Sequence, residues 1–123
     1  MIVRVGRTLL RDLIKGDTTG GITHIGIGEG TAATMDTDTA LSSEVFNYSP
    51  TDRIPTSGGK HGDGSIKIKG LLNCLQGEES HTEVGLFTSN SSGTMFLRNA
   101  SFSAEINKTL SRYNRYTIII DTK

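Results

Sequence analysis

Short segments in which apolar and polar residues alternate, separated by turn residues, occupy the chain from Gly21 onward. This two-residue period is typical of β-strands that bury one face. The predicted strands cover residues 22–27, 44–48, 65–72, 82–88, 94–100 and 115–121, the last with a β-branched run typical of a central strand. Residues 31–43 and 50–64 are predicted loops. The sequence therefore predicts a mainly β chain, with an antiparallel β-sandwich of about six or seven strands over residues 21–123.

Residues 1–16 follow a helical period and form a predicted amphipathic helix ahead of the β-sandwich. One stripe of this helix is basic and the opposite side is apolar. The basic residues are Arg4, Arg7, Arg11 and Lys15, and the apolar residues are Leu9, Leu10, Leu13 and Ile14. Gly16 is placed to end the helix, whereas Gly6 weakens its first turn, so we expect the helix to begin near Arg7.

Two interpretations of this helix stay open. It either covers the core of its own domain, or it is a docking arm that presents its apolar face to another subunit. In the second case the basic stripe would meet an acidic partner surface. The region from Gly21 onward already contains enough strands for a closed sandwich, which slightly favours the docking arm.

The charge balance and the single cysteine exclude several classes of protein. Lys plus Arg and Asp plus Glu number 13 each, so the net charge of +0 gives no bulk attraction to nucleic acid or to an anionic membrane. Cys74 alone builds neither a disulfide framework nor a cysteine zinc site. No apolar run approaches the roughly 20 residues that span a bilayer, and the first residues lack the apolar core of a signal peptide. We therefore expect one domain of 123 residues that is made in the cytoplasm.

Gly26, Gly28 and Gly30 form a GxGxG pattern that invites comparison with nucleotide-binding loops. A dinucleotide fingerprint has the spacing GxGxxG and opens a helix, whereas the residues that follow here, TAATMDTDT, are a poor helix start. A tight turn or bulge at the end of a strand explains the glycines better. The pattern therefore predicts no bound cofactor.

Three carboxylates, Asp36, Asp38 and Glu44, are close enough in sequence to suggest oxygen ligands for a hard cation. The further acidic positions and the central glycine of an EF-hand are missing, and Asx-turns explain aspartates in a Thr-rich loop. No serine stands in a GxSxG motif, and Cys74 lies among leucines as a buried, inert thiol. These residues predict no metal site and no enzymatic activity.

Three segments of the chain occur in a fixed order and are informative as a set. The first is ITHIGIGEGT at residues 22–31 with DTALSSE at 38–44, the second is EVGLF at 83–87 with FLR at 96–98, and the third is FS at 102–103 with INKT at 106–109. Together they resemble a group of small virion proteins of tailed phages and prophages, the tail-fibre, collar or minor structural proteins. The positions that we single out in these motifs are Gly26, Gly28, Gly30, Thr31, Asp38, Leu41, Glu44, Glu83, Gly85, Leu86 and Phe87.

The resemblance implies a non-enzymatic structural protein of the virion. Its role would be that of an oligomeric assembly or adaptor component of the tail, the neck or collar, or the fibre attachment, with other virion proteins and copies of itself as partners. A capsid decoration protein is the alternative within this class. A carbohydrate-binding β-sandwich is the alternative from another class, and it would display aromatic side chains, of which the chain has only 4 Phe, 3 Tyr and no Trp.

Two expectations concern individual motif positions. Family members often carry an arginine soon after the glutamate of DTALxxE, and residues 45–48 contain none, so the sequence gives Glu44 no partner. Gly85 suits close backbone packing, and Leu86 and Phe87 point to opposite faces of their strand. This strand is then covered on both sides, which is usual where a neighbouring subunit presses on the outer face.

Overall fold

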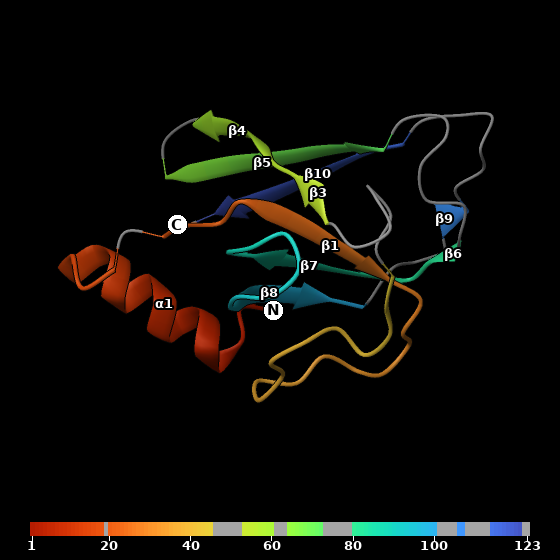
Figure 1. The fold of residues 1–123 in the computed structure, drawn as a ribbon, viewed down its shortest axis with the longest axis horizontal. Helices are drawn as coiled ribbons and strands as arrows, with labels where there is room; N and C mark the ends of the chain where they lie inside the picture. Colours follow the sequence, from red (N-terminus) through yellow and green to blue (C-terminus); the bar gives the residue numbers. More distant parts are fainter. Residues whose placement is uncertain are drawn as a thin grey trace.

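The computed structural model describes residues 1–18, 20–45, 53–60, 64–72, 80–100, 106–107 and 114–121. These residues form one helix and ten strand segments (Figure 1). In chain order they are α1 (Arg4–Lys15), β1 (His24–Gly28), β2 (Glu44–Val45), β3 (Ile54–Pro55), β4 (Ser57–Lys60), β5 (Ser65–Leu72), β6 (Ser80–His81), β7 (Glu83–Phe87), β8 (Met95–Asn99), β9 (Ile106–Asn107) and β10 (Asn114–Asp121). The predicted class, mainly β with one N-terminal helix, is confirmed.

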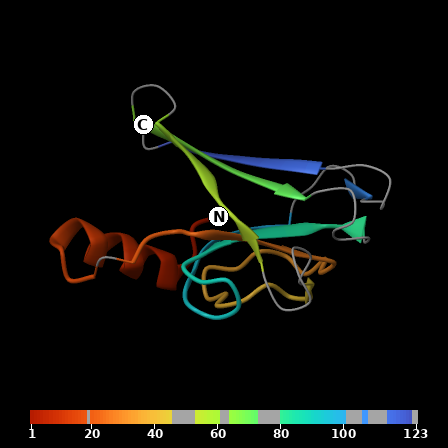
Figure 2. The ribbon, with the colours of Figure 1, turned by 45° about the horizontal axis from the view of Figure 1, so that its top comes forward.

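Two antiparallel sheets lie in layers, one above the other (Figure 2). The first has the strand order β2-β1-β7-β8, and β3 pairs with the end of β1 that β2 leaves open. The second has the order β10-β5-β4. A further short pair joins β6 to β9. Every pairing between these strands is antiparallel, as predicted.

The segment that contains β3 and β4 joins the two sheets directly. Ile54 and Pro55 pair with β1 of the first sheet, and Ser57, only two residues after Pro55, begins the pairing with β5 of the second. The predicted loop over residues 50–64 is therefore wrong for residues 54–60. Its glycines and prolines favour a loop locally, but hydrogen bonds to two neighbouring strands override that preference.

The main core lies between the two sheets. Its buried residues are Ile25, Ile27, Ile54, Ile68, Val84, Leu86, Phe96 and Tyr116. Isoleucines of β5 occupy alternate positions, with Ile68 only 9% exposed, as the predicted two-residue period requires. Apart from Ile54, which lies in a predicted loop, the core thus forms from the inward positions of the strands that the alternation identified.

A second apolar cluster lies on the opposite face of the first sheet and contains Val3, Leu41, Phe87 and Met95. As a result β7 is buried at all five positions, with Leu86 in the main core and Phe87 in this second cluster. The expected cover on both faces of this strand is confirmed. The outer cover, however, comes from the chain's own Val3, Leu41 and Arg53, so no neighbouring subunit is needed to explain it.

Helix α1 lies at one end of the sandwich and packs against β8 (Figure 1). It begins at Arg4, so the expected start near Arg7 is wrong. Gly6 is buried in the first turn against the main chain of Phe96, where a bulkier residue would not fit. Gly16 ends the helix as predicted, with a left-handed φ of 80°. Its N–H donates to the carbonyl of Leu13, and the N–H of Asp17 donates to the carbonyl of Asp12.

Strand β10 pairs with β5 on one side, and no other described strand pairs with it. The prediction that residues 115–121 form a central strand is therefore wrong for the described sheets, where β10 is an edge. Its β-branched run reflects the burial of one face: Ile118 and Ile120 are half-buried against the core, whereas Ile119 is 51% exposed. Such a run indicates a packed face and carries no information on how many neighbours the strand has.

Candidate functional site

Most of the motif positions gather on the outer face of the first sheet. Gly26 and Gly28 lie within β1, opposite Gly85 and Glu83 of β7. A Cβ on Gly28 would stand 2.5 Å from a carboxylate oxygen of Glu83 and 2.6 Å from the carbonyl oxygen of Ser43. The predicted turn or bulge is wrong for these two glycines, which instead leave room for residues 29–45 to lie close to the sheet.

Glu83 is the centre of a hydrogen-bond network on this face and is 0% exposed. Its Oε2 accepts hydrogen bonds from the main-chain N–H groups of Ser43 at 2.7 Å and Gly30 at 2.9 Å. Its Oε1 accepts from the N–H of Ser42 at 2.9 Å and from Nε of Arg98 at 3.0 Å. Two carboxylate oxygens with four donors are saturated, so Glu83 has no acceptor position left for a substrate proton.

Arg98 of β8 extends this network along residues 29–45. Its guanidinium, in a side chain that is 1% exposed, donates to Oδ2 of Asp38 at 3.0 Å and to the carbonyls of Ala32 at 2.8 Å and Ala33 at 3.3 Å. Glu83 and Arg98 therefore bind both the first part of this segment, residues 30–33, and its later part, residues 38–43. We call this set (Glu83, Arg98 and Asp38, with the main-chain groups they bind) the Glu83 network.

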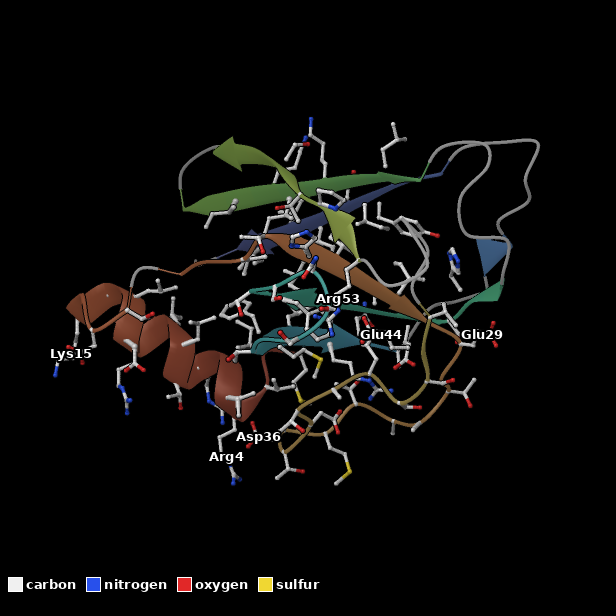
Figure 3. All side chains as sticks on the ribbon, viewed as in Figure 1. Arg4, Lys15, Glu29, Asp36, Glu44 and Arg53 are labelled. Atoms are coloured by element: carbon white, nitrogen blue, oxygen red, sulfur yellow. The ribbon has the colours of Figure 1, made fainter. Side chains whose placement is uncertain are left out.

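A second buried ion pair joins Glu44 to Arg53. Arg53 donates from Nε and from its terminal nitrogen to the two carboxylate oxygens of Glu44, at 2.5 and 2.9 Å. It also donates to the carbonyls of Ser89 and Ser92, and its guanidinium lies 3.5 Å from the centre of the Phe87 ring. Figure 3 shows Glu44 and Arg53 next to each other. Glu44 thus has the arginine partner that the sequence did not assign to it, nine residues further along the chain.

The pKa of Glu83 reflects the balance of these contacts. Burial by itself would raise the pKa of the carboxyl group, but the N–H groups of Ser43 and Ser42, the Arg98 guanidinium and the N–H of Gly30 stabilise the charged form. Together they hold the pKa of Glu83 below its ordinary value. The group therefore stays ionised at neutral pH and acts as a fixed anchor for the main chain.

The three carboxylates that suggested a cation site do not face one another. Asp36 pairs with Arg7, Asp38 with Arg98 and Glu44 with Arg53. No group of three or more potential metal ligands forms among the residues that the structure describes. The acidic spacing in residues 36–44 reflects three separate ion pairs.

The basic stripe of α1 is paired throughout with carboxylates of the same chain. Arg4 and Arg7 both reach Asp36, at 3.4 and 2.6 Å, which joins the start of the helix to residues 29–45 (Figure 3). Further along, Arg11 lies 2.8 Å from Asp12 and Lys15 lies 3.9 Å from Asp17. These pairs are exposed and contribute little to stability, but they neutralise the stripe.

The apolar side of α1 divides into a packed half and an open half. Leu9 packs against the main core, whereas Leu10 is 42% exposed and Ile14 is 78% exposed. Beside them an apolar cleft of about 410 Å³ opens between the helix and the two sheets. Its lining is apolar at every position: Ile2, Leu9, Leu10, Leu13, Ile22, Ile66, Ile68, Phe96 and Ile120.

The structure therefore assigns the predicted positions to two places. Except for Leu86 in the main core, the motif residues lie on or over the outer face of the first sheet, where Leu41 is buried and Thr31 is exposed. The predicted docking residues form α1. Sequence reasoning missed Arg53, for which no local signal exists, and the role of Arg98, although FLR at 96–98 belonged to the motifs.

Comparison with protein-family models, with curated proteins and with solved structures gives no match. In the described part of the chain, no helix has the length and apolar character needed to cross a membrane.

Proposed function

We propose that this chain is a non-enzymatic structural protein of a tailed-phage virion and works as an oligomeric assembly or adaptor component. It docks through the open half of α1 and the apolar cleft beside it. The occupant of that cleft is an apolar segment of another virion protein. The observation that carries this proposal is the exposure of Ile14 and Leu10 beside a cleft with a wholly apolar lining.

Apolar side chains that lie together at the edge of a cleft and remain exposed to water are typical of a surface that binds another protein. Ile14 is the most exposed large apolar side chain of the described residues, and Leu13, one residue before it, lines the cleft. Burying such a side chain on association contributes about 1.5–3 kcal/mol. A partner that fills the cleft and covers Ile14 therefore gains a substantial part of its binding energy there.

The charge pattern favours an apolar contact over an acidic one. The four basic side chains of α1 each lie within 4 Å of a carboxylate of the same chain, at distances from 2.6 to 3.9 Å. An acidic partner would have to compete with these carboxylates. We therefore give the apolar half of the helix the main part in docking.

The virion setting of the proposal comes from the sequence resemblance. The motif positions serve internal anchoring: Glu83 and Glu44 are both engaged by buried arginines, which suits a building block better than a catalyst. The carbohydrate-binding alternative receives no support from the aromatic residues that the structure describes. Phe87, Phe96 and Tyr116 are each at most 7% exposed and offer no ring for stacking on a sugar.

Co-expression with the products of neighbouring genes tests the proposal. The full chain should co-purify with a head or tail protein, and Ile14→Glu should abolish that association because it places a charge in the apolar contact. Met35→Glu is the matched control, since Met35 is also exposed, at 59%, but lies on residues 29–45 away from the cleft lining. Absence of the chain from purified virions, or equal binding by both variants, would contradict the proposal.

A further inference from the structure

Leu10 and Ile14 form an exposed apolar ridge on the later half of α1. They stand four residues apart, about one helical turn, so their side chains lie one above the other on the same side of the helix. Both are exposed, Ile14 more than Leu10. Figures 1 and 2 both show this half of α1 extending beyond the ends of the strands, which leaves room for a second molecule beside the ridge.

Opposite charges stand at the two ends of the ridge. Arg7 lies three residues before Leu10, and Asp17 lies three residues after Ile14, just past the end of the helix. Both side chains are exposed. The order along the chain is cation, apolar, apolar, anion, with spacings of three, four and three residues, which read the same in both directions. Turned end for end, this order places an anion opposite each cation and an apolar residue opposite each apolar residue.

We propose that α1 pairs with α1 of a second copy of this chain, antiparallel, with the two-fold axis midway between Leu10 and Ile14. Leu10 of each copy then faces Ile14 of the other. Arg7 of each copy lies at the C-terminal end of the other helix, beside Asp17. The two-fold axis repeats every contact, so the interface is isologous and closes with two copies.

The ion pairs at the ends of the ridge favour a second copy over a partner of one charge. Arg7 lies 2.6 Å from Asp36, and Lys15 lies 3.9 Å from Asp17. Each end therefore carries a cation together with an anion. A second copy presents the same two kinds of charge to each end, whereas an acidic or a basic segment would bring one charge of each pair against its own sign. Opposite charges across an interface fix its register more than its strength.

The helix dipoles and the charge beside the ridge agree with the antiparallel arrangement. The C-terminal end of a helix attracts cations, so Arg7 of one copy gains from its position at the end of the other helix. Arg11, which lies beside the ridge, is 2.8 Å from Asp12 of its own chain. The cation near the two-fold axis is thus already matched, which limits repulsion between the two copies.

This pairing regulates the docking surface. Leu10 and Leu13 line the apolar cleft, so a second helix on the ridge covers one side of it. Each copy then masks the surface that the virion partner needs, and the two occupants exclude each other. A stable interface buries about 800 Å² on each partner, whereas the ridge offers two apolar side chains, so the pairing is weak and displaceable. The masking rests on the proposed function, because only a chain that docks through α1 has a surface to mask.

Cysteine cross-linking of the full chain tests the arrangement, with Cys74→Ser as background. Chains with Leu10→Cys, mixed with chains with Ile14→Cys, should form a disulfide-linked dimer under mild oxidation, because these positions face each other. Neither variant should cross-link alone. Two copies of one position lie four residues apart along the axes, about 6 Å, in addition to the separation across the contact, which exceeds the reach of a disulfide.

Arg4→Cys mixed with Ile14→Cys is the control for this cross-link. Position 4 lies six residues before position 10, which is the position that faces Ile14, so this mixture should stay monomeric on oxidation. Equal cross-linking in the control mixture, or none between positions 10 and 14, would overturn the pairing. Cross-linking of each variant with itself and not in the mixture would show parallel helices and would also overturn it.

Charge reversal provides an independent test by sedimentation. Asp17→Arg should raise the dimer dissociation constant about tenfold, because an attractive contact becomes repulsive at both ends. The substitution suits the end of its own helix, where a cation is favoured, so the fold is kept. Glu29→Arg is the matched control, with the same charge change far from the end of α1, as the labels Glu29 and Lys15 in Figure 3 show. Equal dissociation constants for the two variants would overturn the pairing.

The masking is tested with the head or tail protein that co-purifies with the full chain. Sedimentation should show that its binding separates the paired copies, so that each docking site holds one copy of this chain. Asp17→Arg should bind it more tightly at the same concentration, because fewer copies are masked. A complex that keeps two paired copies at one site would overturn the masking.

These outcomes separate the inference from the proposed function. A chain that stays monomeric at high concentration but still binds a head or tail protein contradicts the pairing alone. A dimer that cross-links between positions 10 and 14 but binds no head or tail protein keeps the pairing and contradicts the proposed function.

Discussion

Gly6 of α1 lies against the main-chain carbonyl of Phe96 in β8, so closely that a Cβ on Gly6 would stand 2.0 Å from the carbonyl oxygen. In an exposed helix, alanine in place of glycine would stabilise the fold. Here Gly6→Ala should lower the free energy of unfolding by about 1–3 kcal/mol, because the helix must move away from the strand. Thermal denaturation measures the effect, with Gly20→Ala as the control, since nothing lies within 4 Å of a Cβ there. Equal melting temperatures for the two variants would contradict this close approach.

Removal of one partner of the Glu83–Arg98 pair should be strongly destabilising. Glu83→Gln or Arg98→Met breaks this buried ion pair, and Arg98→Met leaves the charge of Glu83 without a cation, so each should cost about 3–5 kcal/mol in urea denaturation. The double variant should lose less than the sum of the two, because the groups are in contact. Asp12→Asn breaks an exposed pair with Arg11 and should change stability by less than about 1 kcal/mol. Additive losses would show that the pair is not coupled.

The stability of the fold should decrease in acid through Glu83. Because its pKa in the folded state is lowered, the ionised group stabilises the native state above the unfolded-state pKa of about 4.3. That contribution is lost as the pH falls from there through the folded-state pKa. Urea denaturation at several pH values should therefore show a drop in unfolding free energy below about pH 4.3, and the drop should be smaller in Glu83→Gln.

Asp36 is the control for this acid dependence. Its hydrogen bond from Arg7 lowers the pKa of its carboxyl group, so it titrates in the same direction as Glu83. Asp36 is exposed, however, and Asp36→Asn should leave most of the acid dependence in place. If the unfolding free energy of Asp36→Asn did not change with pH, and that of Glu83→Gln fell in acid as in the unmodified chain, Asp36 and not Glu83 would be the source of the acid dependence.

Arg53→Lys should destabilise the chain although the charge is kept. A lysine cannot form the two parallel hydrogen bonds to Glu44 while also reaching the carbonyls of Ser89 and Ser92. It also loses the stacking on the Phe87 ring. We expect a loss of about 1–3 kcal/mol, measured by urea denaturation. Lys69→Arg, on the second sheet, is the control, and an equal effect there would contradict a specific role for the guanidinium.

The alternation of residues identified most of the strands, because burial of one face leaves a two-residue period in the sequence. Ile66 and Ile68 illustrate this in β5, whose bounds match the prediction. The period does not report which strands are neighbours, so the edge position of β10 and the transfer of residues 54–60 between sheets were not predictable from it. Gly6 was misjudged for a related reason: a local scale counts its cost to the helix and omits its contact with Phe96.

The candidate site could be predicted only as a set of positions. The motif resemblance singled out Glu83 and Glu44, but their arginines lie 15 and 9 residues away, at separations that no helical or strand period links. Arg98 was visible as a motif residue without a role. Pairing of this kind depends on how β7, β8 and residues 29–45 are brought together in space, which the tertiary fold alone determines.

Glu83 and Arg98 also impose an order on the acquisition of structure. The N–H of Gly30 is held by a carboxylate 53 residues further along the chain, and the carbonyl of Ala32 by a guanidinium 66 residues further along. Contacts at such separations form late, because the intervening chain must first be closed into a loop. A nascent chain must therefore leave residues 29–45 without their full set of anchors until both Glu83 and Arg98 have emerged from the ribosome. The amide protons of this segment should be the last of the first sheet to gain protection from exchange.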